Sequence, residues 1–154
     1  MLLFPHTIIL RHRKENLKKC SLRGLETRPD FQFFTYPLAQ PLPDLSSYIL
    51  LSLGAPPLTE ADRGLGLFLI DGTWRHTDTM FQQLPQPQQF TLRSIPSIFQ
   101  TAYPRRQNDC PDPSRGLASI EALFIAYHIL GRSTDGLLDF YHWKDIFFSK
   151  NNIK

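Results

Sequence analysis

The sequence contains few of the residues that build metal sites or disulfide frameworks. Its 154 residues include two cysteines, Cys20 and Cys110, and neither lies in a Cys-x-x-Cys or Cys/His cluster. Five histidines are present without the spacing of metal ligands, and we assign no metal to the chain. Because two cysteines do not make a disulfide framework, we expect a reducing, cytoplasmic location.

Long apolar runs are also absent. No segment approaches the roughly 18 uninterrupted apolar residues of a membrane helix, so we expect a soluble protein with no membrane partner. The apolar segment 1–10 is interrupted by Pro5 and His6 and has no cleavage site after it, which favours a first strand over a signal peptide. Hydrophobic residues make up 42% and charged residues 20%, a balance that excludes a disordered chain and predicts a single domain over residues 1–154.

The motifs of several common enzyme classes are missing as well. The chain has no Gly-x-Gly-x-x-Gly fingerprint, no P-loop, no His-Glu-x-x-His pair and no Gly-x-Ser-x-Gly elbow. The sequence therefore gives no support to a Rossmann dinucleotide enzyme, a P-loop nucleotidase, a zinc protease or an α/β-hydrolase.

Charge is present but unevenly distributed. The net charge is +3, yet residues 11–28 carry seven basic and two acidic residues, whereas residues 30–71 carry five acidic residues and one basic residue. A basic segment beside an acidic one is typical of a surface that docks a polyanion next to a different site. The alternative is an ordinary solvated loop, and charge alone does not separate the two.

Short apolar runs alternate with helical patterns along the chain. We predict strands at 7–10, 31–36, 48–53 and 67–70, with a further short segment at 90–92. We predict helices at 56–63, 76–84, 114–130 and 134–150, the first with Thr59 as its N-cap. This alternation predicts an α/β fold with a mainly parallel, helix-covered sheet.

Asp71 is the residue that chemistry singles out. It directly follows an apolar strand, and ligands bind beyond the carboxyl ends of strands in open α/β sheets. A carboxylate in that place either serves a ligand or caps the next helix, a role that Thr73 shares. Trp74 is either a core residue or the wall of a pocket for a flat or cationic ligand.

Glu121 is a further candidate, because it lies inside the apolar helix predicted at 114–130. A carboxylate there needs a partner such as a backbone N–H or Arg93, so a structural role is as plausible as a chemical one.

Several segments together resemble one family, the ribosomal-RNA aminocarboxypropyltransferases, which are relatives of the DTW-domain proteins and members of the knotted SPOUT class. The core of the resemblance is Asp71-Gly72-Thr73-Trp74. The other matching segments, in the family's order, are 16–21, 58–63, 93–96, 102–104, 117–122 and 140–143 with Asn151. The chain departs from the family in the loop Tyr103-Pro104-Arg105-Arg106-Gln107-Asn108 and in Thr77, where a small residue is usual.

The resemblance implies a fold and a reaction. The implied fold is SPOUT-like α/β with a C-terminal trefoil knot, divided into a basic N-terminal portion at about 1–45 and a cofactor-binding portion at about 46–154. The implied reaction transfers the 3-amino-3-carboxypropyl group of S-adenosylmethionine to N3 of a uridine or pseudouridine in small-subunit ribosomal RNA. The implied partner is that RNA or a pre-ribosome, and we expect a monomer.

The resemblance also assigns residues. Asp71 and Trp74 are the implied catalytic residues, with Asp71 as the base or as the group that orients the ribose or base. The implied cofactor-binding residues are Lys19, Cys20, Ser21, Asp71, Trp74, Thr77, Ile95, Pro96, Ala102, Tyr103, Leu117 and Ala118. The implied RNA-binding residues are Arg11, Arg13, Lys14, Arg105 and Arg106.

Three other functions remain open at this point. The first is a SPOUT-class RNA methyltransferase, which would share the cofactor and direct a different carbon at the base. The second is an aminocarboxypropyltransferase that acts on transfer RNA. The third is a non-enzymatic RNA-binding factor in ribosome assembly.

Overall fold

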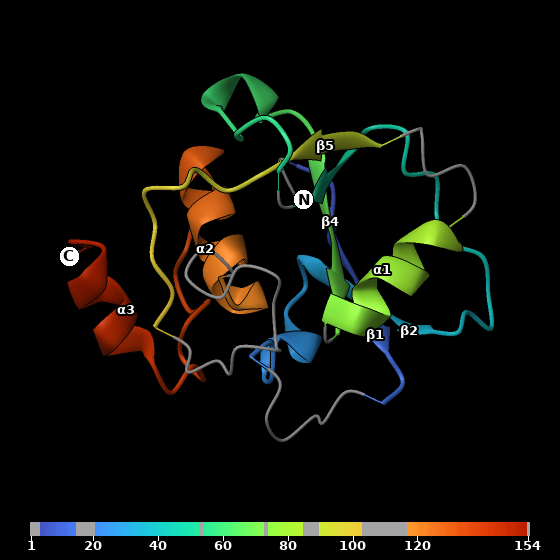
Figure 1. Ribbon diagram of the computed structural model, residues 1–154, viewed down its shortest axis with the longest axis horizontal. Coiled ribbons are helices and arrows are strands. Elements are labelled where there is room, and N and C mark those ends of the chain that lie inside the picture. Colours follow the sequence, from blue (N-terminus) through green and yellow to red (C-terminus); the bar gives the residue numbers. More distant parts are fainter. Residues whose placement is uncertain are drawn as a thin grey trace.

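A computed structural model describes residues 4–14, 21–52, 54–72, 74–84, 90–102 and 117–153, without the side chains of Trp74 and Arg75 (Figure 1). Its centre is a five-stranded sheet in which every pair of neighbouring strands is parallel. The strand order is β2-β1-β4-β3-β5. The strands are β1 (Thr7–His12), β2 (Phe31–Tyr36), β3 (Tyr48–Leu51), β4 (Gly66–Asp71) and β5 (Thr91–Arg93).

Helices cover both faces of this sheet. The α-helices are α1 (Trp74–Gln82), α2 (Ser119–Ile129) and α3 (Lys144–Lys150), and two 3-10 turns, η1 (Leu25–Thr27) and η2 (Glu60–Asp62), lie between strands. In Figure 1, α1 lies on one side of the sheet and α2 on the other, with α3 outside α2. Within the described ranges, no helix is long and apolar enough to cross a membrane.

The strands supply side chains to two separate cores, because successive residues of a strand point to opposite faces. The α2-side core includes Ile9, Leu67 and Leu69 of the strands with Leu123 and Tyr127 of α2. The α1-side core includes Ile8, Leu10, Leu50 and Phe68 of the strands with Met80 of α1 and Leu84. Burial on both faces explains the continuous apolar runs of these strands.

The predicted strands are confirmed within one or two residues, and the predicted helices less closely. The segment predicted at 134–150 is helical only in α3, and the helix at 114–130 is observed from Ser119 to Ile129. The helix at 56–63 is the short 3-10 turn η2, which Thr59 caps as predicted by exchanging hydrogen bonds with Asp62.

The predicted fold class needs correction. We expected an α/β, helix-covered, mainly parallel sheet that is SPOUT-like with a C-terminal trefoil knot. The observed fold is mixed α/β with a five-stranded, all-parallel sheet and three α-helices, and the described residues do not show a SPOUT knot. After β5 the described chain adds only an isolated bridge at Ser94 and the two helices α2 and α3. The knot was implied by the resemblance alone, because hydrophobic periodicity carries no information about threading.

Candidate functional site

Asp71 lies at the carboxyl edge of the sheet, which we define by the last residues of β1, β2 and β4: His12, Tyr36 and Asp71. Its side chain is nearly buried, with the residue 4% exposed. Asp71 Oδ1 accepts a hydrogen bond from Ser119 Oγ at 2.9 Å, and Oδ2 accepts one from Arg11 Nε at 3.4 Å. The carboxylate therefore joins the ends of β1 and β4 to the beginning of α2.

Arg11 is held among anionic and aromatic groups at the same edge. It is 8% exposed, its Nη1 donates to Glu26 Oε2 at 3.2 Å, and its guanidinium lies 4.7 Å from the centre of the Phe33 ring. Burial alone would raise the pKa of Glu26, but hydrogen bonds from the backbone and from Arg11 outweigh it and hold this pKa below its usual value. The sequence predicted that Arg11 contacts an RNA phosphate. Such a contact has to form beside the ion pairs that Arg11 makes with Glu26 and Asp71.

Glu121 is fully buried and is satisfied by four hydrogen bonds. Its Oε1 accepts from Thr101 Oγ1 at 2.7 Å and from the Ala118 backbone N–H at 2.8 Å. Its Oε2 accepts from the Ala102 backbone N–H at 2.8 Å and from Tyr141 Oη at 2.9 Å. The sequence suggested a backbone N–H or Arg93 as the partner of Glu121. Backbone N–H groups are observed, and Arg93 instead pairs with Asp62 at 3.2 Å. Glu121 thus fastens the segment before α2 to the segment that follows β5.

Several predicted cofactor-binding residues pack against the α2-side core or adjoin the beginning of α2. Ile95, Ala102 and Leu117 pack against the α2-side core, and Ala118 is the N-cap of α2. Ser21 Oγ accepts a hydrogen bond from the Ile120 backbone N–H at 3.3 Å, which brings the segment after the basic loop to the same place. Pro96 directly follows Ile95 and is half-buried.

The segment that carries Ile95 and Ala102 is fastened at three points. The Ser94 backbone N–H donates to the Pro56 carbonyl at 2.9 Å, and Glu121 holds Thr101 and Ala102. The Asn151 side chain accepts from the Gln100 N–H at 2.7 Å and donates to the Gln100 carbonyl at 2.8 Å. The backbone of this segment is therefore preorganised beside α2.

The remaining predicted site residues are placed differently. Thr77 is half-buried on α1, and Arg13 and Lys14 are exposed after β1. Lys19, Cys20, Tyr103, Arg105 and Arg106 lie outside the described residues, as does the side chain of Trp74. In the described part of the chain, no three His, Cys, Asp or Glu side chains are grouped in a way that could hold a metal ion.

Two histidines that sequence reasoning did not select also meet at the carboxyl edge. The ring of His12, the last residue of β1, stacks on the ring of His76 in α1 with a centroid separation of 4.0 Å and an interplanar angle of 9°. His12 ends β1 and His76 lies in α1, the helix that follows β4, so the two rings meet through the pairing of these adjacent parallel strands, which no single-sequence pattern indicates.

The comparisons with known proteins bear on this fold. A scan against protein-family models and a search of curated proteins gave no match. Among solved structures, the chain is similar to the SAM-dependent rRNA:acp-transferase Tsr3 from Vulcanisaeta distributa, with a TM-score of 0.72 and 24% sequence identity. The alignment covers 96% of this chain and 79% of that one. The chain therefore has a Tsr3-like α/β fold.

Proposed function

We propose that this protein is an RNA aminocarboxypropyltransferase. In this proposal it transfers the 3-amino-3-carboxypropyl group of S-adenosylmethionine to N3 of a uridine or pseudouridine in small-subunit ribosomal RNA, and the broken sulfur–carbon bond releases methylthioadenosine. The observation that carries the proposal is the Tsr3-like fold over 96% of the chain, since the similar structure is described as a SAM-dependent rRNA:acp-transferase. The placement of the predicted site residues supports it, because Ser21, Asp71, Ala102 and Ala118 all approach the beginning of α2.

The residues around α2 fit an adenosine-containing sulfonium compound. Ile95, Ala102 and Leu117 offer partly buried apolar surface, and the backbone between them is held by Glu121 and Asn151. Such a combination of apolar surface with fixed backbone groups is usual in cofactor sites. Pro96, Tyr103 and Ala118 would complete the adenosine contacts. Lys19, Cys20 and Ser21 would hold the amino-acid carboxylate through charge and backbone N–H groups.

When bound, S-adenosylmethionine supplies a sulfonium leaving group, so the protein's task is to aim the correct carbon at the base. In our proposal Trp74 and Thr77 would cover the methyl group, and the ring face of Trp74 would attract the sulfonium charge. Asp71 then takes the proton of N3 or orients the ribose or base. Arg11 and Ser119 hold its carboxylate in one orientation.

The RNA would be held by cations on the surface. Arg13 and Lys14 are exposed beside the carboxyl edge, whereas Arg11 is buried in ion pairs with Glu26 and Asp71. Together with Arg105 and Arg106 they would contact phosphates, which position an RNA without reading its sequence. A role in ribosome biogenesis, a cytoplasmic location, a monomeric state and a relationship to the DTW-domain proteins belong to the same proposal.

The test begins with calorimetric titration of S-adenosylmethionine into the wild-type protein and into Trp74→Ala. It continues with mass analysis of nucleosides after incubation with small-subunit ribosomal RNA or with transfer RNA. We expect binding that the variant loses, and an aminocarboxypropyl-uridine or aminocarboxypropyl-pseudouridine in the ribosomal RNA alone. A methylated nucleoside would instead identify a methyltransferase, and modified transfer RNA would change the substrate. Absence of binding to the wild type would leave a non-enzymatic RNA-binding factor.

A further inference from the structure

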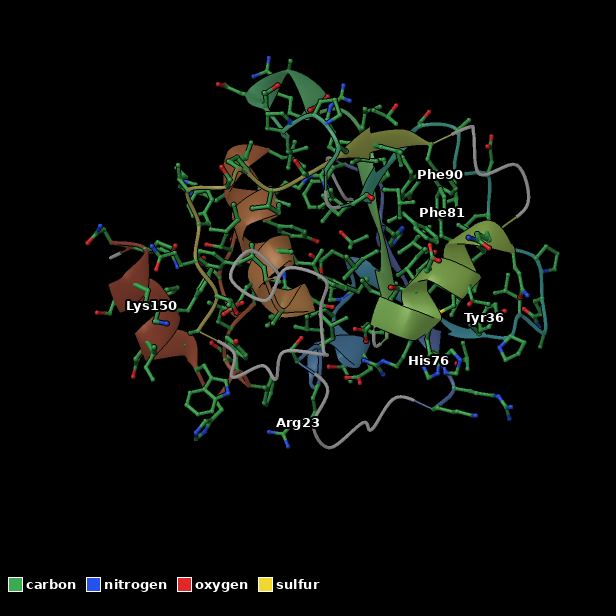
Figure 2. All side chains as sticks on the ribbon, in the orientation of Figure 1. Arg23, Tyr36, His76, Phe81, Phe90 and Lys150 are labelled. Atoms are coloured by element: carbon green, nitrogen blue, oxygen red, sulfur yellow. The ribbon has the colours of Figure 1, made fainter. Side chains whose placement is uncertain are left out.

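Three half-exposed aromatic rings from three elements meet on the α1 side of the carboxyl edge. His12 ends β1, Tyr36 ends β2 in register with it, and His76 lies near the beginning of α1. The His12 ring lies 4.0 Å from the His76 ring and 5.6 Å from the Tyr36 ring, measured between centroids. Figure 2 shows His76 and Tyr36 on the same side of the molecule, close to α1. We name these three residues the ring cluster.

The ring cluster is held in place by close packing on Gly72 and by two hydrogen bonds. Gly72 lies against both histidines, since a Cβ at this glycine would be 3.3 Å from His12 Cβ and 3.7 Å from His76 Cβ. The Tyr36 hydroxyl donates to Gln83 Oε1, and the Lys14 backbone N–H donates to His12 Nδ1 at 3.1 Å. The last bond fixes the orientation of the His12 ring and leaves its other nitrogen to carry the proton.

The His12 ring is neutral, and separate cations lie next to it. Partial burial, followed by the nearby His76, Lys14 and Arg13, lowers the pKa of His12 below its usual 6.5, so its imidazole is uncharged at neutral pH. Arg13 and Lys14 directly follow His12 and are exposed. Aromatic faces beside exposed cations are typical of surfaces that bind single-stranded nucleic acids, where bases stack on rings and cations contact phosphates.

The position of the ring cluster relates it to the proposed reaction site. His12 is adjacent in the chain to Arg11, and Gly72 is adjacent to Asp71, so the cluster lies one residue beyond the Arg11–Asp71 pair. Asp71 and Arg11 point to the α2 side with Ser119, whereas His12 and His76 lie on the α1 side. The cofactor segments and the ring cluster therefore flank Asp71 from opposite faces of one sheet edge.

We propose that His12, His76 and Tyr36 form a stacking surface for an unpaired nucleobase next to the target nucleotide of a single-stranded RNA segment. Arg13 and Lys14 contact the phosphates of the same segment. This inference rests on the proposed function, because it states how the RNA substrate of that site is held. It assigns to the described part of the chain a binding surface that the family resemblance did not include.

The test measures binding of a fluorescently labelled oligouridylate by anisotropy, for the wild type, His12→Ala and His76→Ala. We expect each substitution to weaken binding by on the order of ten-fold, since a base–aromatic stack contributes at that level. His12→Phe keeps a stacking ring and should restore most of the affinity. The matched control is His128→Ala, because His128 is an exposed histidine on α2 near its C-terminal end. Arg13→Ala and Lys14→Ala should reduce the dependence of binding on salt.

Several results would overturn the proposal. These are unchanged affinity in His12→Ala and His76→Ala, equal loss in His12→Phe and His12→Ala, or equal affinity for a duplex of the same sequence. Binding of uridine monophosphate as strong as that of the oligouridylate would point to a free nucleotide as the ligand. Stronger binding of an acidic peptide than of the oligouridylate would point to a protein partner.

Calorimetry with S-adenosylmethionine separates this inference from the proposed function. Oligouridylate binding that depends on His12, in a protein that does not bind S-adenosylmethionine, supports the ring cluster and rejects the transferase. The opposite result is a protein that binds S-adenosylmethionine and forms the product with an unchanged KM for RNA when His12 or His76 is replaced. That result rejects the ring cluster and keeps the transferase.

Discussion

Ser119 Oγ donates a hydrogen bond to Asp71 Oδ1 at 2.9 Å and so joins the first residue of α2 to the last residue of β4. These residues are 48 positions apart in the sequence. The other oxygen of this carboxylate, Oδ2, accepts a hydrogen bond from Arg11 Nε. An acid at the end of a buried strand is costly unless its oxygens are satisfied. Here the groups that satisfy it also connect the proposed cofactor segments to the end of the sheet.

Replacement of Asp71 tests its proposed chemical role. Asp71→Asn keeps the size of the side chain but removes the charge, so we expect the rate of transfer to fall by about 100-fold or more, as for loss of a general base. Ser119→Ala is the control, because it removes one partner of Asp71 and leaves the carboxylate. It should cost about 1 kcal/mol of unfolding free energy and lower the rate far less than Asp71→Asn does, because Arg11 still orients the carboxylate. Single-turnover product formation at saturating RNA measures both. Equal rates in Asp71→Asn and the wild type would exclude a chemical role for this carboxylate.

Glu121 is expected to be a positioning residue. In Glu121→Gln one acceptor oxygen becomes an NH₂ group, which then faces two donors of the set Thr101, Ala102, Ala118 and Tyr141. An unsatisfied buried donor costs about 1–3 kcal/mol, so the unfolding free energy in urea should fall by that amount. The affinity for S-adenosylmethionine should fall as well, because the segment at 101–102 loses its attachment.

The matched control for Glu121 is Tyr141→Phe. It removes one of the four hydrogen bonds and leaves the carboxylate in place, so its cost should be about 1 kcal/mol. If Glu121→Gln were as stable as the wild type, the hydrogen-bond assignment around Glu121 would be wrong.

Hydrophobic periodicity predicted which residues are buried more accurately than it predicted the secondary structure of those residues. Leu137, Leu138 and Tyr141 are core residues, as their apolar pattern indicated, but the chain reaches them through turns and not through a helix. Gly136 has a φ of 79°, which a helix does not allow. By contrast, 31–36 was predicted at its observed bounds, because Pro29 and Pro37 limit this aromatic run to the length of a strand.

The part of the candidate site that lies at the end of a single strand could be predicted from the sequence. Asp71 could be selected because it ends an apolar strand. Charge counting does not tell which cation of a basic segment points inward, so it gave no sign that Arg11 is buried beside Asp71. The pairing of His12 with His76 depends on the parallel register of β1 and β4, which are separated by 53 or more residues in the chain. Single-sequence patterns do not contain that register.

Gly24 is expected to be the favoured residue at its position. Its φ is 93°, and a Cβ built on it would overlap Cδ2 and Cγ of the Phe140 ring. Gly24→Ala should therefore lower the unfolding free energy by about 1–3 kcal/mol. Thermal unfolding of Gly24→Ala, Phe140→Ala and the double variant separates the two causes. The overlap disappears in the double variant and the backbone strain stays, so its loss should be smaller than the sum of the single losses. Strict additivity would show that Phe140 does not contact Gly24.

Tyr127 should make stability decrease at alkaline pH. Its hydroxyl accepts a hydrogen bond from Thr7 Oγ1 at 2.7 Å and donates one to Asp30 Oδ2 at 3.1 Å, and the side chain is fully buried. Burial is the largest cause that raises the pKa of Tyr127 above its usual 10.0, and the neighbouring Asp30 raises it further. Arg28, which binds both oxygens of Asp30, keeps that carboxyl ionised at neutral pH: burial would raise the pKa of Asp30, but the guanidinium lowers it.

The sign of the effect follows from proton linkage. Below pH 10 the phenol is protonated in both the folded and the unfolded chain, and its contribution to stability is complete. Above pH 10 the unfolded chain loses this proton while the folded chain keeps it, so the unfolding free energy falls by up to about 1.4 kcal/mol per pH unit.

Other groups titrate in this range, and the comparison with Tyr127→Phe isolates the contribution of Tyr127. The variant should lose about 1–3 kcal/mol at pH 7, because Thr7 and Asp30 lose a partner, and it should show a shallower decline between pH 10 and pH 11.5. Urea unfolding at half-unit pH intervals measures both quantities, and parallel declines in the two proteins would contradict the raised pKa of Tyr127.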